Sequence, residues 1–135
     1  MYNPRFPHRL SVSRVRKGPG GQPIYDANGD PIYDKVQLNA VLMNDGNPMT
    51  DIDGNLLTET IDEISFGYRT NSLNTRSASD VAVSDFKIAT PMFITPLFPG
   101  DLLHLTDYDR TYIGEVVKKM TFNLGSNIWF SEIKN

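Results

Sequence analysis

This 135-residue chain contains no cysteine and only two histidines, His8 and His104, so zinc–thiolate sites and cysteine nucleophiles are excluded and histidine chemistry has only two candidates. His8 stands in a basic, proline-rich segment, and His104 alternates with Leu103 and Leu105 in a pattern typical of a strand. No serine or aspartate stands in a recognisable nucleophile motif. We therefore predict that the protein is not an enzyme and has no catalytic, cofactor-binding or metal-binding residues.

One segment, Asp51-Ile52-Asp53-Gly54-Asn55, resembles the start of a calcium-binding loop. Such a loop needs oxygen ligands at positions 1, 3 and 5, glycine at position 6 and glutamate at position 12. Here leucine occupies position 6 and aspartate occupies position 12, so the flexible residue is missing where the loop must bend. The spacing therefore favours a turn over a cation site at this segment. Turns are also predicted at Asn28-Gly29 and Asp45-Gly46.

The elements that would position these residues are predicted to be strands. Apolar residues alternate with polar ones in short runs, and no run has sustained helical spacing with an N-cap and a glycine stop. The predicted strands cover residues 8–17, 36–43, 61–69, 81–95, 102–106, 112–122 and 128–133. Short strands at this spacing indicate an all-β fold, a small antiparallel β-barrel or sandwich of about six or seven strands with long inserted loops.

The chain has the length of one domain, residues 1–135, with an N-terminal arm at 1–9. Three long loops are predicted at residues 18–34, 44–58 and 70–80. Loops of this length on so small a scaffold are usually binding elements.

The first long loop contains Pro-Ile-Tyr-Asp twice, on either side of Ala-Asn-Gly-Asp. This pattern predicts a two-stranded ribbon that turns at Asn28-Gly29. The ribbon could protrude and be covered by a partner, or it could fold back on its own domain. A partner surface would include Ile24, Tyr25, Ile32 and Tyr33.

Charge is distributed unevenly along the first half of the chain. Residues 1–17 hold five basic residues and no acid, whereas residues 18–63 hold nine acids and one lysine. A basic segment beside an acidic one would suit head-to-tail pairing of identical subunits. The charges could equally be solvated loop residues. No stretch approaches the ~20 apolar residues of a membrane helix, so no membrane partner is expected.

The order of these signals resembles the small head–tail connector proteins of tailed bacteriophages, also called head-closure or stopper proteins. The resembling features are the opening Asn-Pro-Arg-Phe-Pro-His-Arg at 3–9, a large loop between the first two strands, and Pro-Gly-Asp-Leu-Leu-His-Leu-Thr-Asp at 99–107. Thr-Tyr-Ile-Gly-Glu-Val-Val at 111–117 and Leu-Gly-Ser-Asn-Ile-Trp-Phe at 124–130 complete the resemblance. The loop at 44–58 has no counterpart in it.

The resemblance implies a virion structural protein that forms a ring between portal and tail and gates the DNA channel. Its partners would be identical subunits, the portal or adaptor ring, tail proteins and, transiently, genomic DNA. It would lie at the head–tail interface of the virion after assembly in the bacterial host cytoplasm. The alternatives are a tail-completion or tail-terminator protein and, in a different class, a single-stranded nucleic-acid-binding β-barrel module.

This interpretation predicts two sets of interface residues. Subunit or partner contacts are expected at Arg5, Arg9, Arg14, Ile24, Tyr25, Ile32 and Tyr33. A loop facing the channel lumen is expected to include Asn71, Leu73, Asn74 and Arg76, because small polar residues suit a surface close to DNA.

Overall fold

The computed structural model describes residues 6–67, 69–71, 86–108, 110–122 and 125–133, and these residues form strands and loops without a helix. Buried and exposed side chains alternate along the longer strands, as the period of two in the sequence predicts. The strands are β1 (His8–Val15), β2 (Tyr33–Val36), β3 (Leu38–Val41), β4 (Met43–Asn44), β5 (Asn47–Pro48), β6 (Thr58–Ile61), β7 (Ile64–Phe66), β8 (Thr70–Asn71), β9 (Phe86–Thr90), β10 (Leu102–Asp107), β11 (Arg110–Phe122) and β12 (Gly125–Glu132).

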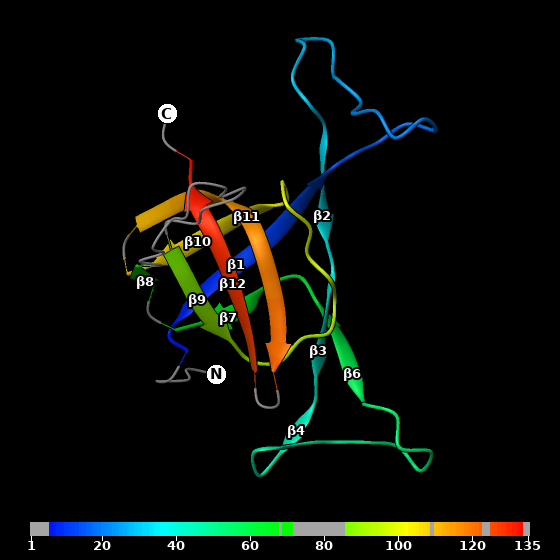
Figure 1. Ribbon diagram of the computed structural model, residues 1–135, viewed down its shortest axis with the longest axis vertical. Helices are drawn as coiled ribbons and strands as arrows, with labels where there is room; N and C mark the ends of the chain where they lie inside the picture. The colour runs from blue at the N-terminus through cyan, green and yellow to red at the C-terminus, as the bar shows by residue number, and fades with distance from the viewer. Residues whose placement is uncertain (1–5, 68, 72–85, 109, 123–124, 134–135) are drawn as a thin grey trace, which may run out of the picture.

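The main sheet is antiparallel and has the order β2-β1-β10-β11-β12-β9-β8, and β7 also pairs with β1 (Figure 1). Its ladder does not close into a complete barrel within the described residues. The nearest approach to closure is one hydrogen bond at the end of β7, where the Gly67 N–H donates to the Ala89 carbonyl at 2.9 Å. The predicted all-β antiparallel fold is therefore confirmed, while in the described part of the chain the barrel that was one of its two predicted forms is not closed, and the main sheet has eight strands.

The core lies on the concave side of this sheet. Phe66, Phe93 and Phe130 are fully buried in it, together with apolar residues of β1, β10 and β12. Gly114 of β11 lies against the Phe130 ring, so the ring occupies the volume that a side chain at position 114 would need. Aromatic burial of this size contributes most of the stability of a small domain.

A non-strand segment, which we call the strap (residues 91–101), covers the core between β9 and β10. The strap runs beside β3. The Val41 N–H donates to the Met92 carbonyl, the Ile94 N–H donates to the Asn39 carbonyl, and Ala40 forms a bridge with Phe93. The sequence predicted a strand over 81–95, and its observed part ends at Thr90. Pro91 and Pro96 lack the N–H that a ladder needs.

Two arms leave the domain in opposite directions (Figure 1). The first arm (residues 16–32) extends from the end of β1 and returns into β2. The second arm (residues 42–57) extends from β3 and returns into β6, which pairs with β3. The ribbon predicted at residues 18–34 lies largely in the first arm, which protrudes rather than folding back on the sheet.

The contact between Gly114 and Phe130 gives a direct test of core packing. Gly114→Ala would place a methyl group against the Phe130 ring, so the ring must shift. We expect a loss of about 1–3 kcal/mol in the free energy of unfolding, measured by urea denaturation. Gly20→Ala is the matched control, because a methyl group there meets no atom within 4 Å. Equal stability of the two variants would contradict this packing.

Candidate interaction surfaces

Each arm is held together by three backbone hydrogen bonds that form a closed triangle. In the first arm, the Arg16 N–H donates to Ile32, the Ile32 N–H donates to Ile24, and the Ile24 N–H donates to Arg16, at 2.7, 2.9 and 2.9 Å. In the second arm, Leu42, Leu57 and Met49 make the same cycle, at 2.9, 2.9 and 2.8 Å. The two arms therefore share one hydrogen-bonding pattern, in which three passes of the chain meet at one point.

The same turn closes the distal loop of each arm. In residues 26–30 the Asp26 carboxylate accepts hydrogen bonds from the backbone N–H groups of Asn28 and Asp30. In residues 51–55 the Asp51 carboxylate accepts the equivalent bonds from Asp53 and Asn55. Gly29 and Gly54 follow with positive φ, which glycine adopts without a steric cost. The segment that resembled a calcium loop is thus built as a turn. No group of three metal-ligating side chains occurs among the described residues.

The tips of the two arms differ in chemistry. Ile52, at the tip of the second arm, is 98% exposed, and the equivalent position in the first arm is Ala27. Met43, Met49 and Leu56 add further exposed apolar area to the second arm. Residues 42–57 also carry three aspartates and no basic residue. The second arm therefore presents an apolar, acidic surface to solvent.

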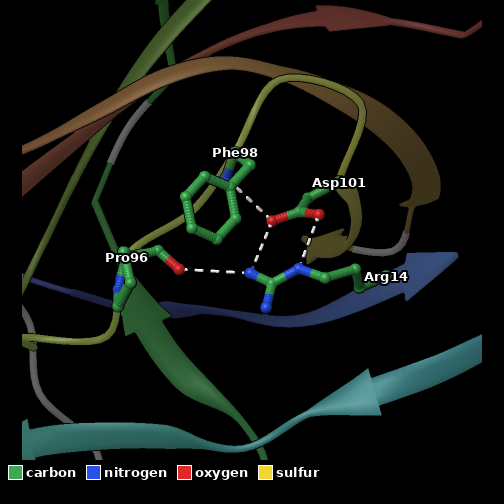
Figure 2. A network of polar contacts seen from close by, with 4 residues as sticks. All are labelled: Arg14, Pro96, Phe98 and Asp101. Carbon is green, nitrogen blue, oxygen red and sulfur yellow. Dashed lines mark hydrogen bonds and ion pairs between the residues drawn. The ribbon is translucent and has the colours of Figure 1, made fainter. Parts of the chain in front are cut away.

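An ion pair anchors the strap to β1 (Figure 2). Arg14 donates from Nε and Nη2 to the two carboxylate oxygens of Asp101, at 2.9 and 2.8 Å, and from Nη2 to the Pro96 carbonyl at 3.2 Å. The Asp101 side chain is only 4% exposed and also accepts the Phe98 N–H at 2.9 Å. The hydrogen bonds to Asp101 raise the pKa of the Arg14 guanidinium. A bidentate pair of this kind fixes orientation as well as distance.

The other end of the strap is fixed by the Phe93 carbonyl. It accepts hydrogen bonds from Lys119 Nζ at 2.8 Å, Thr121 Oγ1 at 3.1 Å and Ser126 Oγ at 3.3 Å. Ser126 Oγ in turn accepts the Phe93 N–H at 3.2 Å. Burial lowers the pKa of Lys119 to about 8. Because β3 pairs with the strap, these contacts also position the base of the second arm.

A third feature is a basic and aromatic row on the outer face of the sheet. Lys118, Trp129 and Lys87 are paired across β11, β12 and β9, and the two ammonium groups lie 4.5 and 5.8 Å from the Trp129 ring. Neither lysine forms an ion pair with a carboxylate of the described residues. Next to this row lies a shallow hollow of about 200 Å³. It is lined by Phe6, Ala89, Thr90, Phe122, Gly125, Ser126 and Asn127.

The residues predicted to contact subunits or partners lie in several places. Tyr25 is exposed on the first arm, Tyr33 is exposed at the start of β2, and Ile24 and Ile32 are half-buried at the triangle of the first arm. Arg14 is held within the chain by Asp101.

Other predicted residues pair locally or lie outside the described part. Arg9 pairs with Glu63 at 3.7 Å, and Arg16 pairs with Asp34 at 2.6 Å, so part of the basic segment meets acidic residues of its own chain. In the loop predicted to face the lumen, Asn71 belongs to β8. Arg5, Leu73, Asn74 and Arg76 lie outside the described residues.

Both histidines lie against other side chains of the domain. His8 is buried and packs against the rings of Phe66 and Tyr108, at centroid distances of 5.3 and 4.7 Å. His104 Nε2 lies 2.9 Å from Ser13 Oγ, on the neighbouring strand β1.

Sequence reasoning missed the equivalence of the two arms and the basic row. The equivalence of the arms had a signal in the sequence, since Asp-x-Asn-Gly at 26–29 is matched by Asp-x-Asp-Gly at 51–54. Pro23 and Pro48 also precede the two motifs by equal distances. The basic row had no signal in the sequence, because Lys87 lies far from Lys118 and Trp129 along the chain. Only the strand order brings the three together.

Comparisons with known proteins provide no relative. No model of a protein family matches the sequence, and neither the curated proteins nor the solved structures contain a match. Among the described residues, no helix is long and apolar enough to span a membrane.

The anchoring ion pair predicts unequal effects for two similar substitutions. Arg14→Met leaves the Asp101 carboxylate buried without its cation, so we expect a loss of about 2 kcal/mol in the free energy of unfolding. Arg16→Met removes a shorter but exposed pair with Asp34, at 2.6 Å, and should change stability little. Urea denaturation of both variants checks this, and a larger loss for Arg16→Met would contradict it.

The environment of Lys119 predicts a rise in stability at alkaline pH. Its pKa is about 8 in the folded chain and near 10.5 when exposed, so the unfolded chain binds more protons between these values. We therefore expect the free energy of unfolding to increase as pH rises from 7 to about 9.5. Lys119→Met should flatten this increase, and Lys118→Met, on the outer face, should not. The same slope in the native chain and in Lys119→Met would contradict the assignment.

Proposed function

We propose that this protein is a non-enzymatic structural subunit that assembles with copies of itself into a ring and works as a head–tail connector of a tailed bacteriophage. The single observation that supports assembly most strongly is the pair of arms that project from opposite ends of one small domain (Figure 1). Their stalks and turns are well hydrogen-bonded, yet their tips make few contacts with the rest of the chain.

The exposed side chains of the arms support a partner-binding role. Tyr25 is 58% exposed on the first arm, and Ile52 is almost completely exposed on the second. Scattered apolar residues on a surface are ordinary, but apolar residues displayed on both protruding arms are typical of contacts that a partner covers. Arms at opposite ends also suit an assembly in which each subunit reaches one neighbour and is reached by another, as closed rings require.

The connector role is the more specific part of the proposal and rests on the order of sequence signals described above. In that role the ring would lie between portal and tail, and loops near its axis would limit the escape of DNA. A tail-completion ring would use the same architecture one step further along the tail.

A second function is favoured by the row formed by Lys118, Trp129 and Lys87. An aromatic ring between two cations on the face of a sheet is the kind of platform on which single-stranded nucleic acid stacks. Binding of a labelled oligonucleotide that weakens as salt rises, and is lost in Trp129→Ala, would support this function.

Assembly of the full chain tests the proposed function. We expect a closed ring in sedimentation velocity and negative-stain images, formed by the chain alone or on addition of the portal ring of the same phage. Tyr25→Ser/Ile52→Ser should weaken ring formation while leaving the melting temperature unchanged, because both side chains are exposed. A chain that stays monomeric at its highest attainable concentration and ignores the portal ring would contradict the proposal.

A further inference from the structure

The tip of the second arm and the outer face of the sheet have complementary chemistry. The tip places one bare aliphatic side chain, Ile52, between the carboxylates of Asp51 and Asp53. The outer face places a shallow hollow beside the row formed by Lys118, Trp129 and Lys87. Each surface therefore pairs an apolar element with charges, and the charges of the two surfaces are opposite in sign.

The hollow and the basic row are continuous because of the strand register. Residues that are paired across neighbouring strands point to the same face, and every second residue along a strand does so too. Asn127 and Ala89 are paired in the row of residues immediately beside Trp129 and Lys87, and Gly125 and Phe122 are paired one row further. The floor of the hollow thus lies two residues along β12 from the Trp129 ring.

Small residues on the sheet keep the hollow open. Ala89 is exposed, and a side chain at Gly125 would come within 2.9 Å of the Thr90 carbonyl oxygen. Phe6 and Phe122 contribute apolar rings to its lining. The hollow could receive one aliphatic side chain, with the lysines within reach of carboxylates on either side of it.

We propose that the tip of the second arm, residues 51–55, docks on the outer face of β9, β12 and β11 of a second copy of this chain. Ile52 enters the hollow beside Trp129, and the flanking carboxylates pair with Lys87 and Lys118. Ile52 is 98% exposed, so it does not fill the hollow of its own chain. Charge complementarity selects a copy of the chain over a membrane surface, because an acidic arm is repelled by anionic lipids.

The contact joins two different surfaces, so it is head-to-tail, and a pair of copies keeps one free hollow on the first copy and one free tip on the second. Repetition of such a contact gives a ring where the rotation closes. The inference thus rests on the proposed ring and names the contact that builds it. The first arm has the same distal turn but carries Ala27 at its tip, so it serves as an internal control.

Disulfide trapping tests the contact directly, because the native chain contains no cysteine. Under mild oxidation, Ile52→Cys/Ala89→Cys is expected to give covalent dimers and higher multimers on a non-reducing gel. Ala27→Cys/Ala89→Cys should stay at background. Equal multimers from both variants, no multimers from either, or only an intramolecular disulfide in the first would overturn the proposal.

Complementation of two defective variants tests the polarity. Ile52→Asp removes the apolar side chain of the tip but leaves the hollow and the basic row intact. Lys87→Glu/Lys118→Glu reverses the charge of the basic row but leaves the tip intact. Each variant alone should associate at least ~30-fold more weakly than the native chain, the effect of losing a residue that dominates an interface. Their mixture should form one-to-one heterodimers in sedimentation velocity. Ala27→Asp should associate like the native chain.

The outcomes separate this inference from the proposed ring. If the native chain forms rings and Ile52→Asp forms them equally well, the ring stands and the docking contact is wrong. If no ring forms but Ile52→Cys/Ala89→Cys is still trapped, the contact stands and the ring function is wrong.

Discussion

The ion pair between Arg14 and Asp101 is the interaction on which the arrangement of the domain depends. Asp101 is almost completely buried, and a buried carboxylate is stable only when its oxygens are paired. Arg14 and the Phe98 N–H supply those partners and tie the strap to β1. Because the strap also pairs with β3, the direction of the second arm depends on the same anchor.

Each arm is a long protruding loop that keeps one shape without a hydrophobic core of its own. The triangle of three backbone hydrogen bonds joins three passes of the chain at one point. The Asp26 and Asp51 carboxylates then satisfy the N–H groups of the distal turns. The loops are thereby ordered by local polar contacts, which leaves apolar tip residues such as Ile52 available for a partner.

Much of the fold could be predicted from the sequence, because its information is local. Alternation over Leu10 and Val12, or over Ile128 and Phe130, indicates a half-buried strand whichever neighbour it has. The turn at Asn28-Gly29 was predicted for the same reason. Interface residues were harder to predict, because whether a side chain is free for a partner depends on residues far away in the sequence. Arg14 is committed to Asp101, a residue far along the chain, and no local pattern reveals that pairing.

By itself, the sequence determined an all-β domain, the positions of most strands and the turns at which the chain reverses, since side-chain alternation and glycine placement act over a few residues. Which strands are neighbours became clear from the folded domain alone. For the same reason the sequence did not reveal that Lys87 lies beside Trp129 and Lys118, or that two arms with the same distal turn point away from each other. Strand order depends on how the whole sheet buries its apolar face, and no single segment encodes that balance.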